Sequence, residues 1–289
     1  RQIAQELECN FNASGETVIS ASDINRLYDG ITEPEYRVGF DRNLWLWGQY
    51  DASCSYLLAA DVARGDGADH SVFHVIKLET MEVIGEYQGK PNLEQFASIL
   101  DSTGREYGNC MLVVENNSLG ISILEKLQDR EYPNLYFSVK STHEYITEEQ
   151  AQGINNSVPG FTTSSKTRPL IIAKMEEFIR NQLITIYSSR LIGEFKTFIW
   201  SNNKAQAMRS YNDDLVMALA IACWVRDTAL TVNLKDMEYN KAMMSSMIIS
   251  NKKMDTTISG MTGHNRSSLQ NEKAKAKKNY EEFIWLLKG

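Results

Sequence analysis

Four carboxylates stand at the ends of apolar runs that lie far apart in the sequence. Asp61 follows SYLLAA, Glu115 follows CMLVV, and the pair Asp213 and Asp214 precedes LVMALAIAC. Acids at strand ends and at the start of a helix can be gathered by a fold into a site for divalent cations. We therefore expect the four acids to serve a site for two Mg²⁺ or Mn²⁺ ions, which would offset their mutual repulsion and activate water to hydrolyse a phosphodiester.

Each acid also has a plainer interpretation. Asp61 could cap a turn, and one of the paired aspartates could cap the helix that follows it. Glu115 is harder to explain in that way, because an ionised glutamate at the edge of an apolar strand is unfavourable unless a cation meets it. Helical spacing favours Asp214 as the member of the pair that faces the metal, with Asp213 as a cap or a supporting residue.

Three basic residues, Lys166, Arg168 and Lys174, recur in one segment, although the chain carries a net charge of -7. The overall charge argues against binding of nucleic acid through a generally basic surface. Lys166 and Arg168 precede an apolar helical run, where they could contact DNA phosphate; solvated loop charges are the alternative. We expect a small positive groove on an acidic body.

Three further residues have weaker claims to a site. Asp69 could add a metal ligand or hold its turn, and the structural role is the stronger interpretation. His70 and His74 lie in a strand-like run, whose spacing lacks the helical geometry of a zinc pair. The stretch GEYQGKP resembles a phosphate loop, but it has too few residues between its glycines and carries Pro91 where Ser or Thr should bind Mg²⁺. We therefore expect no ATPase site of the Walker A type.

A sheet is needed to position the acids. YLLAADVA, SVFHVIKLE and MEVIGEYQ are strand-like runs with short connections, which predicts an antiparallel meander. A helix between Pro91 and Gly108, the buried strand CMLVVE, a helix over residues 120–130 and the strand LYFSV follow. This order predicts the α/β class and a ribonuclease H-like fold, in which helices flank a mixed central sheet.

The remaining segments complete this core. Residues 140–167 are polar and rich in Gly, Ser and Thr, which is typical of a surface excursion that carries function. RPLIIAKMEEFIRN predicts an amphipathic helix, and another helix is expected from about Asp213 to Arg226. Residues 1 to about 50 differ from the rest. They have a turn signal at residues 13–15 and the irregular, aromatic-rich stretch EPEYRVGFDRNLWLWGQYDAS, which suggests a connecting arm.

Composition places the chain among globular proteins. With 289 residues, 43% of them hydrophobic, it can bury a packed core. Its longest apolar stretch is about half the length of a membrane span, so we expect neither membrane insertion nor export. The 4 cysteines are widely separated and form no C-x-x-C pair, which indicates a reducing, cytosolic compartment and no zinc knuckle.

Taken together, these motifs resemble one family. ADVARGDGADHSVFHVI, LVVENNSLGISILEKL, GFTTSSKTRPLIIAKMEEFIR and YNDDLVMALAIA are similar, in order and spacing, to the nuclease domain of the large terminase of tailed bacteriophages. That terminase is the subunit that drives DNA packaging. The opening QELECNFNASGETVIS is similar to the end of the family's ATPase domain, so the likeness runs from the start of the chain to Arg226.

The resemblance implies an endonuclease that cuts concatemeric viral DNA to begin and end packaging, with metal-binding roles for Asp61, Glu115, Asp213 and Asp214. It implies double-stranded DNA, the portal protein, the small terminase and the capsid as partners, at the viral prohead in the host cytoplasm. Many members have histidine where this chain has Asn212, so a histidine-assisted role is not carried over.

The resemblance also implies a division of the chain. We expect residues 1–50 to be a linker or arm from a missing ATPase domain, residues 51–230 to be the ribonuclease H-like nuclease domain, and residues 231–289 to be a tail or appendage. Without the ATPase motifs, the chain should cut DNA but not pump it.

Other functions fit part of the pattern. A junction resolvase or transposase-like nuclease would share the acids, but the excursion at 140–167 and the RPLIIAK helix favour a terminase. DVARGDG loosely resembles the phosphate-binding hairpin of actin-like ATPases and sugar kinases, which need a duplicated second domain and an adenosine site. A module that only docks DNA or portal protein, without cutting, is the third alternative.

Overall fold

The computed structural model describes residues 17–39, 41–63, 69–139, 145–146, 157–202 and 204–226. Contacts within the chain separate one unit, Arg1–Leu234, from a second, Lys235–Gly289, and every described residue belongs to the first. The tail expected over residues 231–289, most of the excursion at 140–167 and the glycine turn at 64–67 lie outside the described residues. The division into an arm, a nuclease domain and a tail stays a prediction.

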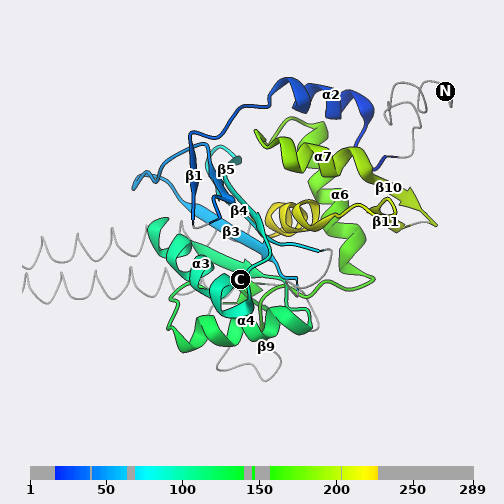
Figure 1. The fold of residues 1–289 in the computed structure, drawn as a ribbon. Helices are drawn as coiled ribbons and strands as arrows, with labels where there is room; N and C mark the ends of the chain where they lie inside the picture. The colour runs from blue at the N-terminus through cyan, green and yellow to red at the C-terminus, as the bar shows by residue number, and fades with distance from the viewer. Residues whose placement is uncertain are drawn as a thin grey trace, which may run out of the picture. The chain divides into compact units, whose positions relative to one another are not determined.

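A six-stranded mixed sheet forms the centre of the fold (Figure 1). In spatial order its strands are β1 (Tyr36–Val38), β2 (Leu44–Leu46), β5 (Glu82–Gly89), β4 (Ser71–Lys77), β3 (Tyr56–Asp61) and β6 (Met111–Val114). Strands β3, β4 and β5 form the antiparallel meander that their short connections predict. Strand β6 runs parallel to β3, which places the carboxyl ends of both strands at one edge of the sheet.

Helices cover both faces of this sheet (Figure 1). On one face lie α3 (Leu93–Glu106) and α4 (Ser118–Asp129), whose apolar side chains share a core with the sheet. The other core includes residues of α2 (Ala21–Asp29), α6 (Thr167–Arg180), α7 (Ser189–Thr197) and a helix over residues 214–226. The expected α/β class, with helices flanking a mixed central sheet, is confirmed.

Burial on both faces explains why the central strands read as continuous apolar runs. In β3, Leu57 and Ala59 join the core beneath the 214–226 helix, whereas Leu58 and Ala60 join the core beneath α3 and α4. Successive side chains of a strand point to opposite faces, so both sets must be apolar when both faces are covered. Strand β6 alternates between the two cores in the same way.

Local signals in the sequence account for the starts of the two helices beside the sheet edge. Asn92 caps α3 and forms a reciprocal capping box with Gln95. Asn117 caps α4 by accepting hydrogen bonds from the backbone of Leu119 and Gly120. Because Asn117 follows β6 almost directly, the chain passes from strand to helix within a few residues of Glu115.

The described part of the first 50 residues contains a helix and two strands, so the expectation that EPEYRVGFDRNLWLWGQYDAS is irregular is wrong where β1 and β2 form. Helix α2 buries Ile24 and Leu27 on one face, and strands β1 and β2 extend the sheet beyond β5. Two smaller sheets complete the described unit: β8 (Tyr145–Ile146), β7 (Phe137–Val139) and β9 (Ser157–Pro159), and the hairpin of β10 (Phe198–Ser201) and β11 (Lys204–Ala207). None of the described helices has the length and apolar character that crossing a membrane requires.

Candidate metal centre

Asp61 and Glu115 lie next to each other at the ends of two adjacent strands. Asp61 is the last residue of β3, Glu115 follows β6, and the Glu115 N–H donates to the carbonyl of Ala60 at 2.9 Å. Strand alternation directs Asp61 to the same face as Leu57 and Ala59, which is the face that the 214–226 helix covers. The charge of Glu115 and its hydrogen bonding both act on the pKa of Asp61, so the two carboxyl groups lie close together. The structure thus brings together these two acids from positions 54 residues apart in the numbering (61 to 115).

The surroundings of Asp61 disfavour its ionised form. Burial is the main cause that raises the pKa of Asp61 well above its ordinary value, and the charge and hydrogen bond of Glu115 and the charge of Asp214 add to it. Carboxylates crowded in this way repel one another, and a cation at the same place would offset the repulsion.

Asp214 approaches this pair from the start of the 214–226 helix. Its Oδ2 accepts hydrogen bonds from the backbone N–H of His70 at 2.8 Å and from the side-chain amide of Asn212 at 3.2 Å. Burial raises the pKa of Asp214 to about 6; the His70 N–H opposes this change, and the charge of Asp69 adds to it. Asn212 also donates to Nδ1 of His70 at 3.2 Å, so it connects the histidine with Asp214.

Asp213 has a different environment from Asp214. Its backbone carbonyl accepts the Met217 N–H at 2.9 Å, which makes Asp213 the cap residue of the helix. Its Oδ2 lies 2.6 Å from Nη2 of Arg168. The structure therefore separates the pair: Asp214 is directed to the other acids, and Asp213 holds Arg168. The metal-binding roles of all four acids stay predictions.

Asn117 and Gly120 fix the position of Glu115. The Asn117 amide donates to Oε2 of Glu115 at 3.1 Å and to the carbonyl of Val62 at 3.4 Å, so it also ties down the chain after β3. A Cβ on Gly120 would lie 1.8 Å from the carbonyl oxygen of Glu115. Only glycine allows α4 to begin so close to this acid.

A buried polar layer supports the start of the 214–226 helix. Glu194 of α7 accepts the Val216 N–H at 3.1 Å and the Gln88 side-chain amide at 3.2 Å. Nε2 of His74, on β4, donates to the carbonyl of Leu215 at 2.9 Å. The first N–H groups of a helix have no partner within it, and Glu194 provides an acceptor for one of them. The layer thus anchors the helix that carries the paired acids.

Burial keeps both titratable groups of this layer neutral at pH 7. It raises the pKa of Glu194 to about 9, and the charges of Asp214 and Glu86 act in the same direction. Burial lowers the pKa of His74, opposed by the charge of Glu86. Glu86 itself accepts hydrogen bonds from Ser188 at 2.6 Å and Arg190 at 2.8 Å. The sequence motifs assign no site role to Glu194, Glu86 or Asn117.

The three predicted basic residues lie in different settings. Arg168 is held at the paired acids by Asp213, and Lys166 is exposed at the beginning of α6. Lys174 instead pairs with Glu177 at 3.3 Å and lies over the ring of Phe178 at 5.1 Å. Arg168 is therefore the one of the three that contacts the candidate centre, and DNA contacts by any of them stay predictions.

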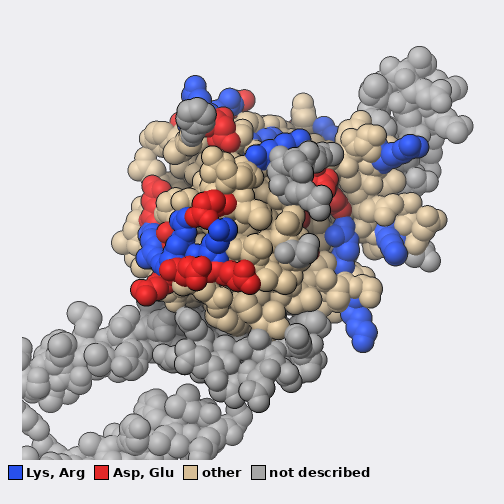
Figure 2. All heavy atoms as spheres, turned by 60° about the horizontal axis from the view of Figure 1, so that its bottom comes forward, with Lys and Arg blue, Asp and Glu red and all other residues tan. Residues whose placement is uncertain are grey.

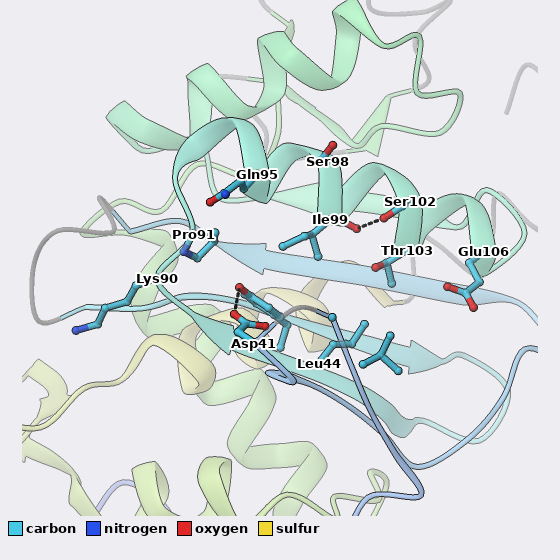
Figure 3. Close-up of a pocket in the computed structure, with 13 residues that line it drawn as sticks. Asp41, Leu44, Lys90, Pro91, Gln95, Ser98, Ile99, Ser102, Thr103 and Glu106 are labelled. Carbon is cyan, nitrogen blue, oxygen red and sulfur yellow. Dashed lines mark hydrogen bonds between the residues drawn. The ribbon is translucent and has the colours of Figure 1, made fainter.

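Lys90 is a further cation beside the centre. Burial and then the charge of Lys90 lower the pKa of His70, so Lys90 lies near this histidine. Figure 3 shows Lys90 at the edge of a cavity of about 500 Å³ between α3 and residues 38–44, with its side chain pointing away from the other labelled residues. Asp41 and Glu106 line that cavity, and Asp41 accepts a hydrogen bond from the Tyr87 hydroxyl at 3.3 Å. Its acidic lining does not suit a phosphate ligand.

Charges over α3 and α4 are mixed. Figure 2 shows basic and acidic side chains interleaved on one face of the molecule. Lys126 of α4 and Arg130 at the C-cap of this helix pair with Glu94 of α3, and Arg105 pairs with Asp101. Since these cations have acidic partners, the two helices do not offer a row of free positive charge to a DNA backbone.

The donor atoms at the centre fit a hard divalent cation. Asp61, Glu115 and Asp214 offer carboxylate oxygens, which are the ligands that Mg²⁺ and Mn²⁺ prefer. Among the described residues, no three His, Cys, Asp or Glu side chains stand ready-placed around one ion. Oδ2 of Asp214 already accepts hydrogen bonds from His70 and Asn212, so an ion bound at this oxygen would compete with those donors.

The strand order, the parallel β3–β6 pair and the acids at its end define a ribonuclease H-like fold, as the sequence predicts. No known family model matches the chain. Among solved structures, the fold is similar to the large terminase nuclease from the thermophilic phage G20c with bound magnesium, at a TM-score of 0.53 and 20% identity over 72% of this chain and 96% of that chain. The same nuclease with bound cobalt matches at a TM-score of 0.53 and 21% identity, over 72% and 96% of the two chains.

A second phage protein has the same fold. The large terminase nuclease domain of Thermus phage P74-26 matches at a TM-score of 0.50 and 21% identity, over 69% of this chain and 93% of that chain. The resemblance to terminase nuclease domains that the motifs indicate is thus confirmed in the fold.

Proposed function

We propose that this chain is a metal-dependent DNA endonuclease that cuts concatemeric viral DNA during genome packaging. The observation that carries the proposal is the convergence of three acids: Asp61 ends β3, Glu115 follows the adjacent parallel strand β6, and the charge of Asp214 acts on Asp61. The fold-level likeness to large terminase nucleases, one of them with bound magnesium, supports it.

The residues of the centre have separate tasks in this proposal. Asp61, Glu115 and Asp214 hold Mg²⁺ or Mn²⁺, and two bound ions would supply an activated water and stabilise charge on the leaving oxygen. Asp213 positions Arg168 beside the acids, where its guanidinium can bind a phosphate of the substrate. Asp69 is exposed, and its charge adds to that around Asp214, so we assign it a supporting role outside the ligand set.

The biological setting follows from the same proposal. Double-stranded DNA is the substrate, bound in part by Lys166, Arg168 and Lys174, and the portal protein, the small terminase and the capsid are the partners. The chain acts at the viral prohead in the host cytoplasm.

Digestion of supercoiled plasmid tests the proposal. We expect the wild type to nick the plasmid with Mg²⁺ or Mn²⁺ and to be inactive in EDTA. Asp61→Asn should abolish cleavage and leave the fold intact or slightly more stable, because it removes an ionisable group from a crowded, buried place. Asp129→Asn, an exposed change on α4, is the matched control and should cut like the wild type. Cleavage that survives Asp61→Asn would overturn the assignment.

A further inference from the structure

A cavity of about 410 Å³ opens between the start of α6 and the β10–β11 hairpin. Arg168, Lys204 and Trp200 line it together with the hydroxyl residues at 163–165, and no acidic residue does. In a chain with a net charge of -7, a cavity with two cations and no acid is a local exception. Its lining therefore favours an anionic ligand.

Trp200 gives this cavity an aromatic wall. The residue lies on β10 and is 50% exposed, and none of the described rings or cations packs against its indole. Lys204 starts the neighbouring strand, is exposed, and forms no ion pair within the described part of the chain. An open aromatic face beside cations is the combination with which proteins bind single-stranded nucleic acid, because the base stacks and the phosphate pairs.

Arg168 links the cavity to the candidate metal centre. Arg168 lines the cavity and lies 2.6 Å from the carboxylate of Asp213, the residue before Asp214. A second contact of Arg168, from Nη2 to the carbonyl of Ala205 at 3.4 Å, joins the hairpin to α6. A ligand in the cavity would thus lie next to the acids, with Arg168 between them.

We propose that this cavity binds an unpaired nucleotide of the DNA strand next to the cut, with its base stacked on Trp200 and its phosphate at Lys204 and Arg168. The inference rests on the proposed nuclease function. The cavity volume lies within the range of about 300–1,000 Å³ that is usual for small-ligand sites. Inside a duplex both faces of each base are covered by its neighbours, so away from the duplex ends the indole can stack only on a base that has left the duplex.

Binding of labelled oligonucleotides, followed by fluorescence anisotropy in EDTA, tests this inference without cleavage. One DNA is a blunt duplex, and the other is the same duplex with a short unpaired thymidine extension. The wild type should bind the extended DNA more tightly than the blunt one. Trp200→Ala should weaken binding of the extended DNA about tenfold and leave the blunt duplex unchanged, whereas Trp200→Phe should keep most of the affinity.

Matched controls separate this inference from a folding defect and from the proposed function. Tyr36→Ala removes another aromatic residue, 48% exposed on β1 and outside the cavity, and should bind both DNAs like the wild type. Circular dichroism spectra of the variants should match the wild type. Equal affinity of Trp200→Ala and the wild type for the extended DNA would overturn the inference, even if the wild type cuts plasmid. Failure of the wild type to cut plasmid would instead overturn the proposed function.

Discussion

Replacing Glu194 with glutamine should make the protein more stable at neutral pH, although Glu194 belongs to the buried layer behind the paired acids. Glutamine has nearly the same volume, and its carbonyl oxygen can accept the Val216 N–H. Its amide group can donate to Gln88 once the Gln88 amide turns over. The change therefore removes the ionisable group of this side chain and keeps its hydrogen bonds and its packing.

The magnitude follows from the pKa of Glu194. Burial, with added effects of the charges of Asp214, Glu86 and Asp213, raises this pKa from 4.5 to about 9. Below pH 4.5 the side chain is protonated in both the folded and the unfolded chain. Above that pH the Glu194 side chain ionises only in the unfolded protein. The wild type therefore loses about 1.4 kcal/mol of stability for each pH unit, until the pH reaches the pKa of Glu194 in the folded protein. At pH 7 this loss is about 3 kcal/mol, and glutamine avoids it.

Urea unfolding, followed by tryptophan fluorescence in EDTA, measures this difference. Glu194→Gln should exceed the wild type in free energy of unfolding by about 3 kcal/mol at pH 7 and by almost nothing at pH 4.5. Other titrating acids are common to both proteins, so they cancel in the comparison. Glu125→Gln, an exposed change on α4, should show no pH-dependent difference. If Glu194→Gln were as stable as the wild type, or less stable, at pH 7, Glu194 would not be a buried neutral acid.

Two further changes test the supports of the centre. Gly120→Ala places a Cβ 1.8 Å from the Glu115 carbonyl oxygen, so it should lower the free energy of unfolding by about 1–3 kcal/mol and reduce plasmid cleavage. Gly193→Ala, whose Cβ would have no atom within 4 Å, is the control and should do neither. A normal melting temperature for Gly120→Ala would contradict the packing argument. Lys166→Ala combined with Arg168→Ala should weaken DNA binding and reduce its salt dependence in anisotropy titrations. Arg180→Ala, at the far end of α6, is the control and should change neither. An affinity that stays unchanged across salt concentrations would show that Lys166 and Arg168 do not contact DNA.

The sheet and the position of two acids could be predicted from the sequence because both depend on local patterns. Residues 56–60 and 111–114 are apolar runs of strand length, and each is followed by an acid. A parallel pair of such strands must bring Asp61 and Glu115 to the same edge. The preference for Asp214 over Asp213 follows from the turn of one helix; in the structure Asp213 caps that helix and pairs with Arg168, and the metal-facing role of Asp214 stays a prediction.

The buried layer could not be predicted, because its contacts join residues that are distant in the sequence. Glu194 meets Val216 across 22 residues, and His74 meets Leu215 across 141. Each lies in a run whose pattern is that of an ordinary helix or strand. Strand β1 was missed for a similar reason: its three residues are all exposed, so it has no apolar alternation and depends on pairing with β2.

Calorimetric titration with Mn²⁺ tests most directly whether the converging acids bind divalent cations. The wild type should show saturable binding at neutral pH, and Asp61→Asn should lose it while keeping a wild-type circular dichroism spectrum. Equal Mn²⁺ affinity in the two proteins would contradict the account, because the ion would then bind without the residue on which the centre is built.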